Sequence, residues 1–360
     1  MIYAILLAIL LVALVLLLAW QLLRWLPAGA DRLKPLPYVI ALLPIAPFCA
    51  ALGLVASAVA AVATRSQNEF YKSYLFLCVA YTLLFVISLK SYTPYLAVRL
   101  LRIKQEKSPE SSLELSLEKS REIRVMTLNC RYGRANASQI IKLAKTHKID
   151  TILLQEVSKK LVKNLEKLGI KHDFAHVQLG SANGHENGGF NAIYTRLSNV
   201  KSFGKSIKID AANVPIVTAV TCDSSAENLL ITFASAHPKS PMRGCAAWSS
   251  GIMALAKIGE NHNENNVKDV KKVTIIGGDL NSTPDHPSFR ALLKSGFLDS
   301  SMQIGKRLKT WPTWQKWPNL ALDHVLVKST GCTAKATEQR AIRVDGSDHF
   351  ALIVCVSIHI

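Results

Sequence analysis

Apolar residues run without a single charge from residue 2 to residue 23, a length sufficient to cross the hydrocarbon core of a bilayer. We predict a transmembrane helix here rather than a cleaved signal peptide, because no basic segment precedes the run and the run is too long. A second span is predicted over residues 36–63, where small residues such as Gly53 and Ser57 allow helices to approach closely. A third, shorter span is predicted over residues 74–89.

The pattern changes after the third run. Tyrosines at its two ends, such as Tyr74 and Tyr92, are typical of an interfacial aromatic belt. Residues 94–104 mix leucine with basic side chains, which favours a helix at the membrane interface. The next stretch is polar and rich in serine, glutamate and lysine, which indicates a linker. We therefore predict a membrane domain over residues 1–104, a linker over residues 105–120 and a catalytic domain over residues 121–360.

From residue 121 on, short strand-like runs alternate with amphipathic segments. Strands are predicted at residues 123–128, 151–154, 192–195, 214–220, 229–234, 273–276, 325–327 and 350–357. Helices are predicted at residues 138–145, 159–167, 243–257 and 288–294. Many strands with helices between them favour a layered α/β domain.

Polar side chains stand where the predicted strands begin or end. They are Asn129, Glu156, His237, Asp279, Asn281, Asp323, His324, Asp348 and His349. Each alone has a simpler explanation, such as a turn residue, a structural histidine or a helix cap. Strands that all end in such groups would bring them together at one rim of the sheets, and such a rim is a place for catalysis.

Composition narrows the class of protein. Hydrophobic residues make up 49% of the chain and charged residues only 19%, which excludes a disordered or wholly soluble chain. The formal net charge is +18, and more than half of this excess follows residue 120. A basic surface attracts phosphate, nucleic acid or acidic lipid, but it also keeps a domain soluble, and composition leaves both interpretations open. The seven cysteines show neither zinc-site nor disulfide spacing.

The order of these polar residues, with GDLN at 278–281, DH at 323–324 and SDH at 347–349, resembles the endonuclease/exonuclease/phosphatase superfamily, which has the DNase I-like fold. HPKSP at 237–241, TWP at 310–312 and the apolar amino-terminal runs are similar to its membrane-anchored bacterial branch, which includes proteins similar to VanJ. The resemblance implies a four-layered α/β sandwich, with two facing mixed sheets flanked by helices.

The resemblance also implies a set of metal ligands. Glu156 would be the principal ligand, helped by Asn129 and by Asp348, directly or through water. Oxygen ligands without a cluster of histidine and cysteine favour Mg²⁺ or Mn²⁺ over zinc.

The remaining roles follow from the same resemblance. Asp279 would orient or deprotonate the attacking water, and Asn281 would hold that carboxylate or a phosphate oxygen. Asp323 would orient His349 beside the phosphate. Two further residues would contact the substrate: His237, by donating to a phosphate oxygen in the transition state, and Asn191. His324 should point to the opposite face of its strand from Asp323.

We expect a membrane-anchored, metal-dependent phosphoesterase acting on a phosphate ester, such as a lipid-linked phosphate. The alternatives are a nuclease, supported by the basic charge although no groove-entering loops are recognisable, and a non-catalytic membrane interaction module. The loop with Trp311, Trp314 and Trp317 is explained by packing or by a platform for a lipid, sugar or bilayer. No protein partner is evident.

The expected location is the bacterial cytoplasmic membrane. Basic residues flanking the predicted spans favour a catalytic domain on the cytoplasmic side. The resemblance instead points to an extracytoplasmic domain, so the side stays open.

Overall fold

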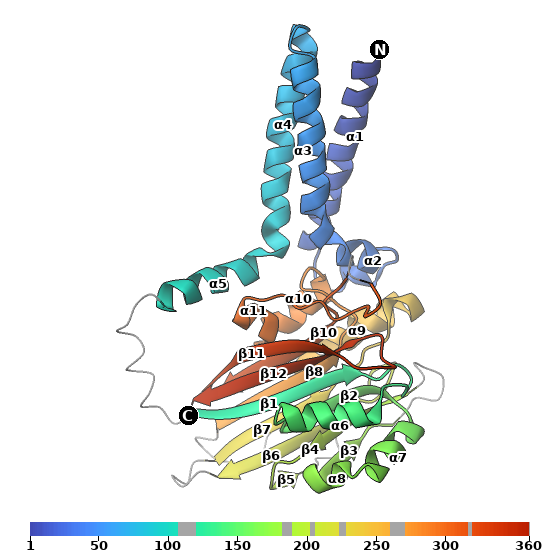
Figure 1. Cartoon of the computed structure of the whole chain (residues 1–360), viewed down its shortest axis with the longest axis vertical. Coiled ribbons are helices and arrows are strands. Elements are labelled where there is room, and N and C mark those ends of the chain that lie inside the picture. The colour runs from blue at the N-terminus through green and yellow to red at the C-terminus, as the bar shows by residue number, and fades with distance from the viewer. Residues whose placement is uncertain are drawn as a thin grey trace. The chain divides into compact units, whose positions relative to one another are not determined.

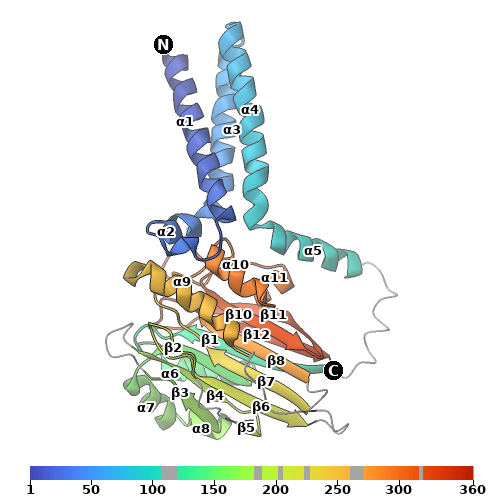
Figure 2. The same ribbon diagram turned by 180° about the vertical axis from the view of Figure 1, so that it is seen from behind.

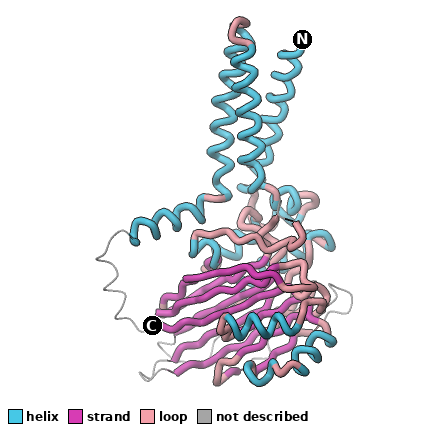
Figure 3. Tube along the Cα trace, viewed as in Figure 1, coloured by secondary structure: helices cyan, strands magenta, loops and turns pink. Residues whose placement is uncertain are grey.

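The computed structural model describes residues 1–106, 120–181, 189–201, 206–222, 228–259, 271–315 and 319–359 (Figures 1 and 3). Most of the predicted linker, residues 107–119, lies outside the described residues. The chain divides into two units, which are described separately. The first comprises Met1–Pro94 and Pro284–Pro287, and the second comprises Tyr95–Thr283 and Ser288–Ile360.

The first unit is helical. Its helices are α1 (Ile2–Leu22), α2 (Leu36–Ala41), α3 (Ala46–Ala63), α4 (Asn68–Ser88) and the beginning of α5 (Thr93–Glu106). Three segments are long and apolar enough to cross a membrane, by length and composition: Ile2–Trp25, Leu36–Ala63 and Asn68–Ser91.

Small residues and tyrosine hydroxyls join α1, α3 and α4. A Cβ atom on Gly53 would lie 2.1 Å from Cε1 of Tyr81, so only glycine leaves room for that ring. The hydroxyl of Tyr81 donates to the carbonyl of Leu10 at 2.8 Å, and the hydroxyl of Tyr74 donates to the carbonyl of Tyr3 at 2.7 Å. Tyr74 is buried, so its expected place in an outward-facing aromatic belt is wrong.

A short segment from late in the sequence, Pro284–Pro287, belongs to the first unit. Within this unit, Oγ of Ser91 lies 3.0 and 2.9 Å from the two carboxylate oxygens of Asp285. Nη2 of Arg24 donates to the same Oγ at 3.2 Å. Arg24 and Asp285 are both buried, and their opposite charges compensate each other there.

The second unit contains the remaining elements. Its helices are α6 (Ala137–Thr146), α7 (Lys159–Lys167), α8 (Ile170–Asp173), α9 (Cys245–Ala254), α10 (Pro287–Lys294) and α11 (Ser300–Ile304). Its strands are β1 (Ser120–Asn129), β2 (Thr151–Val157), β3 (His176–Leu179), β4 (Phe190–Thr195), β5 (Val200–Lys201), β6 (Ile216–Cys222), β7 (Asn228–Ser235), β8 (Lys271–Asp279), β9 (Leu298–Asp299), β10 (Asp323–Thr330), β11 (Thr333–Arg343) and β12 (Phe350–His359).

The strands form two six-stranded sheets. The first has the order β11-β12-β1-β2-β4-β3, and the second has the order β5-β6-β7-β8-β10-β9. In each sheet one central pair is parallel, β1 with β2 and β7 with β8, whereas the other pairs are antiparallel. Both sheets are therefore mixed, as the resemblance implies.

The helices and the two sheets form four layers (Figures 1 and 2). Three hydrophobic cores lie between these layers. Between the sheets, residues such as Val125, Phe233 and Val354 form the central core. A second core packs α6 and α7 onto the first sheet, and a third packs α9 and α10 onto the second sheet. The fold is the predicted sandwich of two facing mixed sheets flanked by helices.

Candidate active site

The polar ends of four strands, two from each sheet, supply the core of the candidate site. Asn129 is the last residue of β1, and Glu156 lies near the end of β2, which runs parallel to β1. In the other sheet, Asp279 ends β8 and is paired directly with Asp323, the first residue of β10. Parallel strands end at the same edge of a sheet, and an antiparallel partner begins there. The topology thus places Asn129 and Glu156 at one edge of the first sheet, and Asp279 and Asp323 at one edge of the second.

Asn129 joins the two sheets at this edge. Its Nδ2 atom donates to Oδ2 of Asp279 at 3.0 Å and lies 3.3 Å from Oε1 of Glu156. Its Oδ1 atom accepts the backbone N–H of Arg131 at 2.9 Å. Asn129 is only 2% exposed, so these bonds form away from competing water. The side chain brings a carboxylate of each sheet to one point.

A left-handed turn after β1 also positions Glu156. Arg131, Tyr132 and Gly133 have φ values of 45°, 56° and 71°, a conformation that non-glycine residues rarely adopt. The turn directs the N–H of Tyr132 to Oε2 of Glu156 at 2.9 Å. Sequence reasoning missed this contact, because only Gly133 signals a turn.

Glu156 itself has φ 51°, at a bulge in the pairing of β2 with β4. A Cβ atom on Gly189 would lie 2.6 Å from the carbonyl carbon of Glu156, so a glycine is required opposite Glu156. The sequence has two consecutive glycines here, and this contact explains Gly189, whereas Gly188 lies outside the described residues. Strained backbone of this kind is concentrated at functional sites.

His349 and Asp323 form a buried hydrogen-bonded pair. Nδ1 of His349 lies 2.8 Å from Oδ2 of Asp323, and Nε2 lies 3.6 Å from Oδ2 of Asp279. Burial lowers the pKa of His349, but the charges of Asp323 and Asp279 outweigh it and raise the pKa to about 10. The raised pKa favours the protonated imidazole, in which Nε2 is a hydrogen-bond donor.

A second imidazole approaches from the end of β7. Nε2 of His237 lies 3.6 Å from Oδ2 of Asp279 and 3.8 Å from Oε1 of Glu156. His237 is only 3% exposed. The Nε2 atoms of His237 and His349 thus both lie near the same oxygen of Asp279, each at a distance longer than a hydrogen bond.

The predicted site residues outside this cluster are placed differently. Asn281, with φ 49°, donates its backbone N–H to Oδ1 of Asp279 at 2.9 Å, so it supports that carboxylate. The carboxylate of Asp348 lies 3.9 Å from Nε of Arg131. The buried amide of Asn191 donates to the carbonyl of Asn213 at 3.1 Å. Within the described ranges, no hydrogen bond or ion pair joins the side chain of Asp348 or Asn191 to the cluster, although the charge of Asp348 helps to raise the pKa of His349.

His324 has a structural environment. Its Nδ1 atom bonds the carboxylate of Asp299, and its Nε2 atom lies 3.0 Å from the carbonyl of Ser282. Its ring packs 4.6 Å from that of Phe289, between centroids. The side chain faces away from the Asp323–His349 pair, as the alternation along a strand predicts.

The tryptophan loop lies beside His349. The ring of Trp311 is 6.4 Å from that of His349 and packs edge-on against Trp314, with centroids 5.9 Å apart. Trp314 is 61% exposed. Trp317 lies outside the described residues.

The donor set fits a hard divalent cation. Carboxylates of Glu156, Asp279 and Asp323 converge, and in the described part of the chain no lysine or arginine forms an ion pair with them. Asp279, Asp323 and His349 each bring one ligand atom within 4.8 Å of the others. This trio is already held together by the Asp323–His349 hydrogen bond, so the less enclosed carboxylate of Glu156 is the better position for an ion.

A family model described as "Endonuclease/Exonuclease/phosphatase family" matches residues 126–349. The chain belongs to this family. It is therefore a hydrolase acting on phosphoester bonds, in a family whose members generally depend on a divalent metal. The match spans every strand end described above, from within β1 to His349, the residue before β12. No curated protein sequence matches the chain.

Solved structures are similar to about two thirds of the chain. A humanized D. rerio TDP2 is 19% identical, with a TM-score of 0.51 over 65% of this chain and 98% of that one. The mannosyl-6-phosphatase of Bacteroides thetaiotaomicron is 17% identical, with a TM-score of 0.46 over 65% of this chain and 99% of that one. At 19% identity, the similarity to TDP2 supports the fold alone.

Proposed function

We propose that the protein is a membrane-anchored, Mg²⁺- or Mn²⁺-dependent phosphoesterase that hydrolyses a phosphate ester presented at the membrane, such as a lipid-linked phosphate. The single observation that carries the catalytic part is the convergence of carboxylates and imidazoles around Oδ2 of Asp279. The anchor is supported by the three segments that are long and apolar enough to span a bilayer.

Glu156 would hold the cation, together with Asp348 and the Oδ1 atom of Asn129, which in this structure accepts the N–H of Arg131. When bound, such an ion neutralises charge on the phosphoryl oxygens and polarises the ester. Asn129 and the N–H of Tyr132 fix both oxygens of Glu156, which leaves the carboxylate oriented but partly open. The Asp348 carboxylate would have to turn from Arg131 to take part.

Asp279 would orient the attacking water and accept its proton. Asn129 and the N–H of Asn281 each bind one of its oxygens, so the carboxylate is fixed in place. His349, whose raised pKa favours the protonated form, would donate from Nε2 to a phosphate oxygen. Asp323 holds the opposite nitrogen of that ring and so directs Nε2 toward the substrate.

His237 would provide a second donor to the phosphoryl group. Its Nε2 atom faces the gap between Glu156 and Asp279, where an ester oxygen would bind. Charge builds up on the phosphoryl and leaving oxygens as the ester bond breaks, and a preorganised donor on each side stabilises it.

Two features favour a membrane substrate over a polynucleotide. The spans confine the site to the bilayer, which raises the effective concentration of a lipid substrate. Trp314, beside the site and 61% exposed, offers an aromatic surface to a lipid tail. The net charge of +18 favours the nuclease alternative. Membership in a family of hydrolases disfavours the non-catalytic module.

Salt dependence separates the two substrates. The full-length protein in lipid nanodiscs is given a lipid phosphate and plasmid DNA over a range of salt concentrations. We expect turnover of the lipid with a weak response to salt, since one headgroup makes few ionic contacts. Cleavage of DNA with a steep salt slope, and no turnover of any lipid phosphate, would establish the nuclease instead.

A further inference from the structure

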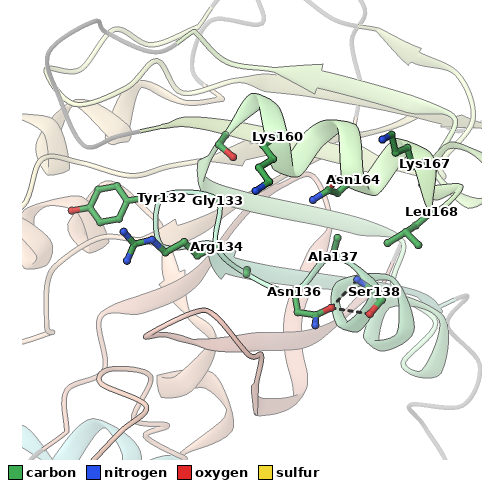
Figure 4. A pocket seen from close by; sticks show the side chains of 12 residues that line it. Tyr132, Gly133, Arg134, Asn136, Ala137, Ser138, Lys160, Asn164, Lys167 and Leu168 are labelled. Atoms are coloured by element: carbon green, nitrogen blue, oxygen red, sulfur yellow. Dashed lines mark hydrogen bonds between the residues drawn. The ribbon is translucent and has the colours of Figure 1, made fainter.

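An open groove of about 690 Å³ lies next to the turn after β1, whose Tyr132 N–H binds Glu156 (Figure 4). One side is the left-handed turn after β1 and the start of α6, and the other is helix α7. Its polar lining includes Tyr132, Arg134, Ser138, Lys160, Asn164 and Lys167. None of the proposed catalytic steps uses this groove.

The groove is positively charged, and the charge is not neutralised. Arg134, Lys160 and Lys167 line it, and no carboxylate does. Neither lysine forms an ion pair with any described residue, whereas Lys171, just beyond α7, lies 2.8 Å from the carboxylate of Glu166. Arg134 lies over the ring of Tyr132, at 5.7 Å from its centroid, which orients the guanidinium without neutralising it.

The spacing on α7 suits an elongated anion. Lys160, Asn164 and Lys167 are separated by four and then three residues, so they share one face of the helix. At 1.5 Å per residue, the two lysines are about 10 Å apart along the axis. The nearby start of α6 is already capped, because Oδ1 of Asn136 accepts from the N–H groups of Ser138 and Gln139. Side chains rather than a helix terminus therefore supply the binding groups.

One residue belongs to both the groove and the active site. Tyr132 lines it, and the backbone N–H of the same residue donates to Glu156. Ser158, which also lines it, follows Glu156 by two residues. A Cβ atom on Gly133 would lie 2.1 Å from Oγ of Ser158, so the turn and the start of α7 pack tightly together. One wall of the groove is therefore built from the same turn that binds Glu156.

We propose that this groove binds a second anionic group of the substrate, a phosphoryl or similar group joined by a spacer to the ester that is cleaved. The enzyme then prefers substrates with two separated anionic groups over simple monoesters. This inference rests on the proposed function, because it places the scissile phosphate at Glu156. It adds a specificity determinant in Arg134, Lys160 and Lys167.

Binding of simple phosphonates tests the proposal without requiring catalysis. Full-length protein in nanodiscs with Mg²⁺ is titrated calorimetrically with alkane-1,n-bisphosphonates of three to ten carbons and with the ω-hydroxyalkylphosphonates of equal length. We expect one spacer length to bind on the order of tenfold more tightly than the analogue with a single phosphonate group. In Lys160→Ala/Lys167→Ala this ratio should fall toward one.

The control is Lys163→Ala, which removes one exposed lysine of the same helix that does not line the groove. It should keep the wild-type ratio. Equal affinity of bisphosphonate and analogue in the wild type would overturn the proposal, as would equal losses in Lys163→Ala and in Lys160→Ala/Lys167→Ala. Hydrolysis of bis(p-nitrophenyl) phosphate, measured in parallel, reports on the proposed function separately.

Discussion

The buried pair of Asp323 and His349 gives the sharpest mutational prediction. Asp323 has no proposed contact with substrate, so it would act only by holding and charging the imidazole. A hydrogen bond to a charged group contributes about 1.5–3 kcal/mol, which corresponds to about 10- to 150-fold in rate. We expect Asp323→Ala and His349→Ala each to reduce kcat/KM by on the order of 10²-fold.

The double variant decides whether the two residues work as one unit. If Asp323 acts through His349, removing both should cost little more than removing His349 alone. The assay is hydrolysis of bis(p-nitrophenyl) phosphate by the full-length protein, with the thermal midpoint measured for each variant. That midpoint matters, because breaking a buried charged pair also destabilises the fold. Losses that multiply in the double variant would mean two independent roles and would refute the dyad.

Asp323→Asn separates charge from shape. It keeps the size of the side chain but removes the negative charge opposite Nδ1 of His349. We expect most of the loss seen with alanine and a smaller change in the thermal midpoint. His172→Ala, an exposed histidine on α8, is the control and should leave hydrolysis unchanged.

Three further predictions concern other parts of the molecule. Gly189→Ala should lower activity and destabilise the fold by about 1–3 kcal/mol, because the added Cβ would meet the backbone of β2. The control is Gly251→Ala in α9, where the added Cβ would make only ordinary contacts. Equal effects of the two variants in activity and melting assays would contradict this prediction. Burial lowers the pKa of His324, but Asp299 outweighs it and raises the pKa, so the pair should stabilise the fold fully below about pH 6.5 and progressively less as pH rises through the raised value. Thermal midpoints against pH should show that decline in the wild type and not in Asp299→Asn. Trp314→Ala should reduce turnover of a lipid phosphate more than that of a soluble ester, and equal losses would remove the aromatic platform.

The central strands were predictable from the sequence because they are buried on both faces. All eight predicted strands are present, most of them longer than expected, and the predicted helix at 159–167 has the same bounds as α7. β11 was missed, although it spans Thr333–Arg343. It is the edge strand of its sheet and carries several exposed polar side chains. Its sequence therefore lacks the apolar run by which the other strands were predicted.

Proximity of the site residues was predictable from strand ends, but their contacts were not. That Asn129 would donate to carboxylates of both sheets depends on how the sheets face each other, and the sequence does not contain this information locally. The positive φ of Glu156 and of Tyr132 likewise gives no signal, because neither residue type favours it. Both conformations are imposed by the surrounding fold.

Metal-dependent hydrolysis by a variant at Glu156 tests the central claim most directly. Full-length wild type, Glu156→Gln and the exposed control Glu166→Gln are assayed on bis(p-nitrophenyl) phosphate in EDTA and across a titration of Mg²⁺ and Mn²⁺. We predict that EDTA abolishes hydrolysis, that either ion restores it, and that Glu156→Gln needs on the order of tenfold or more added metal while Glu166→Gln matches the wild type. Full activity of the wild type in EDTA, or an unchanged metal requirement in Glu156→Gln, would contradict the account.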